Sequence, residues 1–200
     1  MAQEENRKLC QAAHKGLMDG ETGVKFFTSE LLRRQGDLDF SEKPYYRTAF
    51  HEAISMNREP IAKFLLDKNV SMNCTDYLGR TPLHDASYYG YQSLVDLLLE
   101  RKAEIKQDDE GRTPLFRAVE AQRWQIAKTL IEKGCDANVT DKHGCTAYHM
   151  AAFKGLGTQS WWLYCKGAWK NRFALEDTVG EEEPAAAPPA EAAPVPAEGG

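Results

Sequence analysis

The stretch Arg80-Thr81-Pro82-Leu83-His84-Asp85-Ala86 decides the fold, because close variants of it occur three more times in the chain. The variants lie at residues 47–53, 112–118 and 145–151, and the threonines of the four stretches are 33, 32 and 33 positions apart. A fixed period of this length indicates an array of stacked structural units. Each unit of such an array buries its apolar face against its neighbours.

One unit can be read directly from its residues. Asp76-Tyr77-Leu78-Gly79 is a turn sequence, because Gly79 tolerates a positive φ angle. Thr81 follows at the position of a helix N-cap, and Pro82 occupies the first helical position, where its missing N–H costs nothing. A short helix is expected to end near Gly90, and a second helix with an apolar face follows it. Because helices this short are marginal alone, packing between units must stabilise them.

The period and the Thr-Pro-Leu-His-x-Ala core resemble those of the ankyrin-repeat family, and the resemblance covers about residues 8–170. It implies an all-α ankyrin-repeat solenoid of stacked helix-turn-helix units with β-hairpin-like turns. The first predicted segment is an atypical N-terminal capping repeat at 1–42, which contains an insertion at residues 19–23. It is followed by ankyrin repeats at 43–75, 76–107 and 108–140, a degenerate C-terminal capping repeat at 141–172, and a disordered acidic tail rich in Pro, Ala and Glu at 177–200.

The last repeat departs from the pattern. Its outer helix contains Trp161 and Trp162 where Leu, Ile or Val is expected. These two tryptophans, together with Trp169, either pack on the last repeat or contact another chain. We predict a monomer. The alternative is an array cut short after Gly155, in which exposed tryptophans would cause self-association.

The charge of the chain is uneven. The net charge is −5, but residues 176–200 hold seven acids and no Lys or Arg, so the remainder has 23 acids and 25 bases. Such a nearly neutral surface offers no basic footprint for nucleic acid. The sequence has no run of ~18 apolar residues, which predicts no membrane insertion. The five unpatterned cysteines favour reduced thiols, and hence the cytoplasm, the nucleus or both.

His51, His84 and His149 fall at one position of the repeat, which Phe116 fills in the third repeat. The resemblance implies that the imidazoles have a structural role and form hydrogen bonds within the turn next to the threonine. A catalytic role would not tolerate the phenylalanine, whereas a packing role would. We therefore expect these histidines to be structural.

The densest group of ligand-type residues is Cys135, His143, Cys145 and His149. Their spacings of eight, two and four differ from the closely paired ligands of zinc sites. Nothing marks a thiol of low pKa or a third group that orients a Cys–His pair. We therefore predict no enzyme activity, no metal and no cofactor. A small enzyme or metal protein built on this cluster is an alternative of a different class.

In ankyrin-like arrays the ligand is usually held by the turn tips and by late positions of the inner helices, which should line one concave face. Transferred residue by residue, these positions give the candidate protein-binding residues Tyr45, Arg47, Tyr77, Leu78, Arg80, Tyr88, Tyr89, Asp109, Glu110, Arg112, Glu120, Lys142, His143 and Phe153. The four tyrosines should cluster over the first two full repeats, and Tyr and Arg dominate interface hot spots. Alternatively, Tyr88 and Tyr89 only support neighbouring turns.

We predict a non-enzymatic protein–protein interaction module, a scaffold or adaptor, that binds a partner protein through its concave face and its turn tips. The alternative is a regulatory or targeting subunit of a partner enzyme, such as a substrate receptor for a ubiquitin ligase. The sequence shows no adaptor-binding box after the repeats, which counts against that alternative.

Overall fold

The computed structural model describes residues 2–33, 37–41 and 45–168. Within these ranges the chain forms ten α-helices and no β-strand. The helices are α1 (Ala2–Lys15), α2 (Val24–Arg33), α3 (Ala49–Ser55), α4 (Glu59–Asp67), α5 (Pro82–Tyr89), α6 (Gln92–Glu100), α7 (Pro114–Glu120), α8 (Trp124–Glu132), α9 (Ala147–Phe153) and α10 (Gly157–Leu163), followed by the π-helical turn η1 (Tyr164–Ala168). None of these helices is both long and apolar enough to span a membrane.

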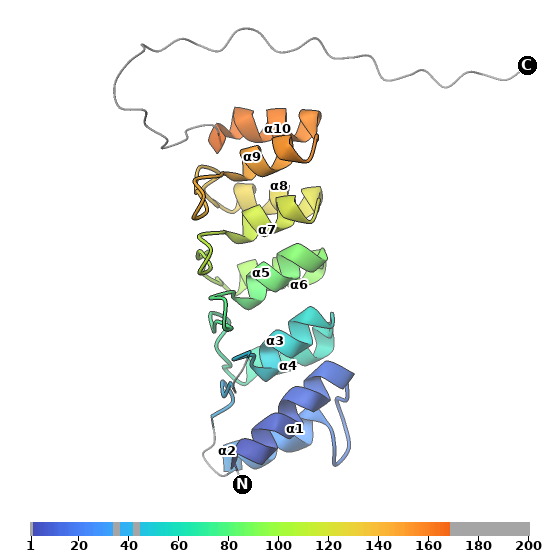
Figure 1. Ribbon diagram of the computed structural model, residues 1–200. Coiled ribbons are helices and arrows are strands. Elements are labelled where there is room, and N and C mark those ends of the chain that lie inside the picture. The colour runs from blue at the N-terminus through green and yellow to red at the C-terminus, as the bar shows by residue number, and fades with distance from the viewer. Residues whose placement is uncertain (1, 34–36, 42–44, 169–200) are drawn as a thin grey trace, which may run out of the picture.

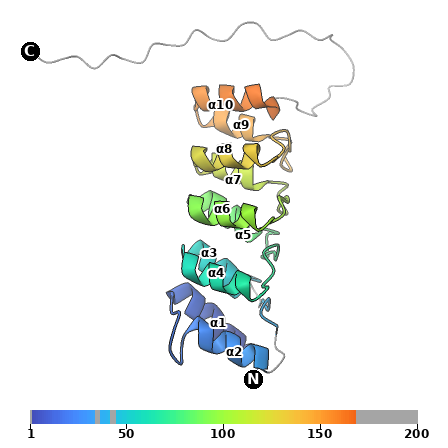
Figure 2. The ribbon, with the colours of Figure 1, turned by 180° about the vertical axis from the view of Figure 1, so that it is seen from behind.

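The helices stack in pairs into an elongated array that runs from α1 and α2 to α9 and α10 (Figure 1). The odd-numbered helices contact one another in succession and form one layer, which we call the inner helices. The even-numbered helices form the other layer, which faces the viewer in Figure 2. Both views place the turns between successive pairs along one side of the stack. The all-α solenoid predicted from the sequence is confirmed.

Each helix pair lies inside one of the predicted repeat segments. The predicted insertion at residues 19–23 falls in the loop between α1 and α2. The predicted tail at residues 177–200 and Trp169 lie outside the described residues. The division into repeats and tail stays a prediction.

The core between the units includes two residues that recur in each of the last four helix pairs. The inner helices bury an alanine and the outer helices a leucine, and all of these side chains have 0% exposure: Ala53, Ala86, Ala118 and Ala151, and Leu65, Leu98, Leu130 and Leu163. The small alanines let neighbouring inner helices approach closely. Each leucine stabilises the fold by about 1.5–3 kcal/mol through burial.

The last outer helix keeps this pattern although its sequence looked degenerate. Leu163 occupies the leucine position, and Trp162 packs against the core. Trp161 remains 42% exposed and stacks on the ring of Tyr164, with centroids 5.2 Å apart. Of the two alternatives for these tryptophans, packing on the last repeat therefore holds for Trp162.

An aspartate closes each of three turn tips. The carboxylate Oδ1 of Asp76 accepts the backbone N–H groups of Leu78 and Arg80, both at 3.0 Å. Asp108 and Asp141 make the equivalent pairs of hydrogen bonds in the next two repeats. The turn of the third repeat therefore has the same length as the other two, although Thr113 follows Thr81 by 32 residues and not 33. The tips are also joined to one another, since the N–H groups of Tyr77, Asp109 and Lys142 donate to the carbonyls of Tyr45, Leu78 and Glu110.

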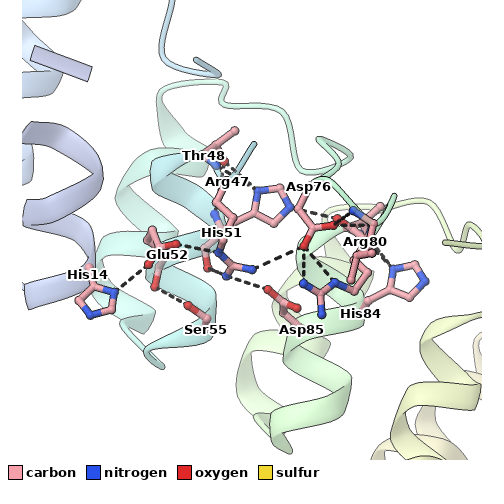
Figure 3. Close-up of polar contacts among 12 residues, drawn as sticks. His14, Arg47, Thr48, His51, Glu52, Ser55, Asp76, Arg80, His84 and Asp85 are labelled. Carbon is pink, nitrogen blue, oxygen red and sulfur yellow. Dashed lines mark hydrogen bonds and ion pairs between the residues drawn. The ribbon is translucent and has the colours of Figure 1, made fainter. Parts of the chain in front are cut away.

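The repeated histidine connects its own repeat to the next one. In α5, Nδ1 of His84 accepts the backbone N–H of Thr81 at 3.1 Å, and Nε2 lies 3.0 Å from the carbonyl oxygen of Arg112. Nδ1 is therefore the acceptor and Nε2 the donor, as in a neutral imidazole. His51 makes the same two contacts, to Thr48 and to the carbonyl of Arg80 (Figure 3). The predicted hydrogen bond within the turn is confirmed, and the bond to the next repeat is additional.

We expect His84→Phe to lower the free energy of unfolding by about 2 kcal/mol, because the buried Thr81 N–H and Arg112 carbonyl lose their partner. Urea denaturation at neutral pH, followed by circular dichroism, measures this change. The control is His143→Phe, since His143 is exposed at a turn tip and its replacement should change stability by less than about 0.5 kcal/mol. Equal stability of the two variants would contradict the role of the bridge.

The same histidine predicts a dependence on pH. Burial lowers the pKa of His84 below its ordinary value of 6.5, so the unfolded chain takes up this proton at a higher pH than the folded chain. The stability contribution of neutral His84 is therefore complete above the unfolded pKa and is lost as the pH falls through it toward the folded pKa. Between about pH 7.5 and 5.5, the stability of the wild type should fall more steeply than that of His84→Phe, by up to about 1.4 kcal/mol per pH unit.

Candidate functional site: the inner-helix face

The inner-helix face is the surface formed by α3, α5, α7 and α9 together with the turn tips at residues 45–47, 77–80, 109–112 and 142–145. All fourteen candidate protein-binding residues belong to these elements. The face has three parts: two pairs of exposed tyrosines, a network of ion pairs between the first two full repeats, and the charged groups of the last two repeats.

The tyrosines form two edge-to-face pairs. Tyr45 and Tyr77 come from neighbouring turn tips, are 59% and 47% exposed, and have ring centroids 5.7 Å apart. Tyr88 and Tyr89 end α5, are 37% and 45% exposed, and have centroids 5.5 Å apart. Among the described residues no ring contact joins one pair to the other. The four rings therefore form two separate pairs, whereas the sequence analysis expected one cluster.

Neighbouring groups hold these rings in place. The guanidinium of Arg117 lies over the ring of Tyr88, 4.5 Å from its centroid. Arg80 lies over Tyr77 at 5.9 Å. Tyr89 stacks on Tyr91, whose hydroxyl donates to the carbonyl of Ser55 in the preceding repeat. One side of these tyrosine rings thus packs against neighbouring side chains, while the other side faces solvent.

Arg47 is the centre of the ion-pair network (Figure 3). Its Nε donates to Glu52 Oε1 at 2.7 Å and its Nη2 to Asp85 Oδ2 at 2.9 Å. Because Asp85 lies on the next inner helix, 38 residues along the chain, this arginine ties the first two full repeats together. Only 20% of the Arg47 side chain and 6% of the Asp85 side chain is exposed.

Arg80 and Asp76 form the second half of the network. The Nε and Nη2 of Arg80 donate to Asp76 Oδ2 at 2.9 and 2.6 Å, and the Asp76 side chain is fully buried. Burial acts to raise the pKa of Asp76, but the hydrogen bonds from Arg80 and from two backbone N–H groups outweigh it and lower the pKa. Asp76 therefore stays ionised, and Arg80 points its charge inward.

His14 extends the network to the first inner helix. Its Nδ1 lies 2.7 Å from Glu52 Oε2, so both oxygens of Glu52 are engaged (Figure 3). Burial acts to raise the pKa of Glu52, but the hydrogen bonds from His14 and Arg47 outweigh it and lower the pKa. The guanidiniums of Arg47 and Arg80, both expected to contact a partner, are thus committed to internal ion pairs that fix the shape of the face.

The charged groups of the last two repeats are less tightly paired. At the tips, Lys142 Nζ lies 3.3 Å from Glu110 Oε1, and Asp109 and His143 are exposed. On the helices, Glu120 Oε2 accepts from Arg117 Nη1 at 2.5 Å, and Phe153 is 89% exposed. The remaining candidates, Leu78 and Arg112, are half-buried.

Sequence reasoning missed the residue that follows the repeated histidine. This position holds Glu52, Asp85 and Arg117 in the three central repeats, and each is a member of an ion pair on the face. The signal was present, since aligning the four repeats shows a charged side chain at this place in three of them. His14 was missed because its partner Glu52 lies in the next unit, and Asp76 because its burial against Arg80 of its own unit is not visible in the sequence.

The buried Cys135 and the half-buried Cys74 lack the chemistry of a nucleophile. Burial raises the pKa of Cys135 to about 11, and also that of Cys74, whose Sγ lies 3.5 Å from His51 Nδ1. Both are therefore thiols at neutral pH. Within residues 2–33, 37–41 and 45–168 no three His, Cys, Asp or Glu side chains are grouped to hold a metal ion.

We expect iodoacetamide to label Cys165, which is exposed, and to leave Cys74 and Cys135 unmodified in the folded protein at about pH 8. Both thiols are largely protonated at that pH, and packing shields Cys135 fully and Cys74 in part. Peptide mass spectrometry after timed labelling, with a urea-unfolded sample as control, measures the order. Rapid labelling of Cys135 in the folded protein would restore the nucleophile hypothesis.

We expect Arg47→Met to lower the free energy of unfolding by about 3 kcal/mol, since it leaves Asp85 buried without its partner. Chemical denaturation measures the loss. The control is Arg101→Met, because Arg101 pairs with Asp67 where both side chains are well exposed, and such a pair contributes less than about 1 kcal/mol. A loss no larger than that of the control would show that the network is not structural.

Comparison with known proteins agrees with this architecture. Residues 9–109 match the family described as "Ankyrin repeats (3 copies)", and residues 103–151 match "Ankyrin repeats (many copies)". The chain is 34% identical to Rabankyrin-5 of Homo sapiens over 119 residues, which are 52% of this chain and 10% of that protein. It is 35% identical to the B-cell lymphoma 3 protein homolog of Mus musculus over 116 residues, 55% of this chain and 26% of that protein.

A third relative, the neurogenic locus notch homolog protein 2 of Homo sapiens, is 34% identical over 137 residues, which are 67% of this chain and 6% of that protein. The chain thus spans about a quarter or less of the length of these relatives. What they share with it is the repeat array, and the first family match alone extends over half of the chain. The chain belongs to the ankyrin-repeat family.

Proposed function

We propose that this chain is a non-enzymatic scaffold or adaptor that binds a partner protein through its inner-helix face, with the main contacts at the two tyrosine pairs. Ankyrin repeats are generally protein-binding modules, and the observation that carries the proposal is the exposure of Tyr45, Tyr77, Tyr88 and Tyr89 above a largely internally paired surface. Large aromatic side chains that are exposed in the free protein are the residue type that dominates interface hot spots.

The packing of neighbouring side chains against the tyrosine rings favours binding. A partner that covers a mobile side chain loses affinity, because ordering that side chain costs about 0.5–1.5 kcal/mol. Tyr88 is already held by Arg117 and Tyr89 by Tyr91, so little of this cost is left. The Arg47–Asp85 ion pair adds to the effect, because it fixes the two repeats that carry the rings relative to each other.

The proposal also includes the cellular compartment in which the protein acts. All five cysteines are free thiols, at least one of them exposed, which fits a reducing compartment such as the cytoplasm or the nucleus. A regulatory or targeting role, such as a substrate receptor for a ubiquitin ligase, would use the same face, and the identity of the partner would decide between these roles.

The test is affinity capture from native lysate with the full chain and with the triple variant Tyr77→Ala/Tyr88→Ala/Tyr89→Ala, followed by quantitative mass spectrometry. The matched control is Phe26→Ala/Trp161→Ala, which removes exposed aromatic rings from α2 and α10, away from the face. We expect the control to keep its partners and the triple variant to lose them.

The captured partner is then purified and its dissociation constant is measured for all three proteins. Loss of central aromatic contacts predicts binding at least about 30-fold weaker for the triple variant. Equal affinity for the triple variant and the wild type would place the interface elsewhere and remove the proposal. Circular dichroism and urea denaturation of each variant check that folding is unchanged.

A further inference from the structure

The charge at one repeated position reverses in the third full repeat. After the repeated histidine come Glu52 in α3 and Asp85 in α5, but Arg117 in α7, where Phe116 replaces the histidine itself. In the first two repeats the two acids neutralise Arg47 of the turn tip. The third repeat offers a cation at the place where the pattern has an acid.

The reversal leaves Arg112 with too few acceptors. Its equivalent, Arg80, donates two hydrogen bonds to Asp76, whereas in the described part of the chain the Arg112 side chain makes none to Asp108 or to any other group. Its nearest carboxylate is Glu120, with Nη1 3.9 Å from Oε1. Since Glu120 already accepts from Arg117, two guanidiniums share a single carboxylate.

The two guanidiniums also keep unused donors. The Nε atoms of Arg112 and Arg117 are buried and have no hydrogen-bond partner. A guanidinium has five N–H donors, and each one that burial leaves unpaired lowers stability. The side chains themselves are 25% and 13% exposed, so part of each reaches the surface of the inner-helix face. The two Nε atoms themselves are closed to solvent, so a further carboxylate would bind the exposed part of each guanidinium and supply the acid that the first two repeats provide internally.

Aromatic rings fix these two cations. Arg112 lies over Phe116, 5.6 Å from the ring centroid, and Arg117 lies over Tyr88 at 4.5 Å. A stacked guanidinium is preorganised, so it loses little freedom when a carboxylate binds to it in a bidentate manner. The exposed ring of Tyr88 borders Arg117, and the ring of Tyr89 packs against that of Tyr88, so the two rings offer an apolar contact next to the charge.

We infer that Arg112 and Arg117 bind the carboxylate of an Asp or Glu side chain in an acidic segment of the partner protein, while an apolar residue beside that acid packs on Tyr88 and Tyr89. The inference rests on the proposed function and specifies the chemistry of the partner. Over the first two repeats a basic segment fits less well, because their acids Glu52, Asp76 and Asp85 are already paired with arginines.

The probe is a phage-displayed library of random peptides, selected on the immobilised full chain. We expect the selected peptides to be enriched in Asp and Glu next to an aromatic or aliphatic residue. The best of them, made as a fluorescent peptide, should bind about tenfold more tightly than its counterpart with the acid changed to Asn or Gln, as measured by fluorescence anisotropy. Added salt should weaken the acidic peptide more than its neutral counterpart.

The decisive variant is Arg117→Glu, which restores the acid that the first two repeats carry and gives Arg112 an internal partner. It should weaken the acidic peptide about tenfold or more, and Arg117→Lys should weaken it less, because charge is kept while the bidentate fork is lost. Arg101→Glu makes the same change of charge at an exposed site at the end of α6 and should have no effect.

The outcomes separate this inference from the proposed function. Selected peptides without acidic enrichment that still lose binding in Tyr88→Ala/Tyr89→Ala would overturn the acidic chemistry and leave the face as the binding site. Peptides that bind all of these variants as well as the wild type would overturn both. A selection that yields nothing above an uncoated surface would also count against both. Circular dichroism confirms that each variant is folded before it is compared.

Discussion

The contact between one helix pair and the next is the constraint on which the rest of this molecule depends. Helices of seven to nine residues, as α3 to α10 are, do not persist alone, so each unit is ordered by what its neighbours provide. The neighbours provide three things: a buried alanine and leucine in each unit, the tip-to-tip backbone hydrogen bonds, and the bond from a buried histidine to the carbonyl of the next repeat.

These contacts explain which parts of the fold were predictable. The repeated Thr-Pro-Leu-His stretch fixes a helix start within one unit, so the helix pairs and their order followed from the sequence. The leucine of the last outer helix was harder to see, because Trp161 and Trp162 around it broke the apolar pattern. Its position 33 residues after Leu130 was nevertheless a usable signal.

The site was predicted less completely, for a physical reason. Tyr45, Tyr77, Tyr88 and Tyr89 could be placed on one face because exposure there follows from position in the repeat. Whether Arg47 is available to a partner depends on an acid in another unit, since Asp85 is 38 residues from it. Arg80 pairs with Asp76 of its own unit, four residues earlier in the chain. Distances between side chains across a repeat interface depend on how neighbouring repeats stack, and the sequence of a single repeat does not show this. The arginines therefore looked available, although they are paired.

Electrostatics divides the inner-helix face into two kinds of surface. Over the first two full repeats, arginines and carboxylates neutralise one another in a largely buried network, and this part is rigid and presents tyrosine rings. In the third repeat the tip arginine, Arg112, shares Glu120 with Arg117, and Phe116 stands where a histidine would have joined this repeat to the fourth. Buried charge that the fold does not pair is expensive, and folds keep it where a ligand can supply the missing partner. The border between the two surfaces runs beside Tyr88, where a rigid aromatic ring and an incompletely paired cation meet.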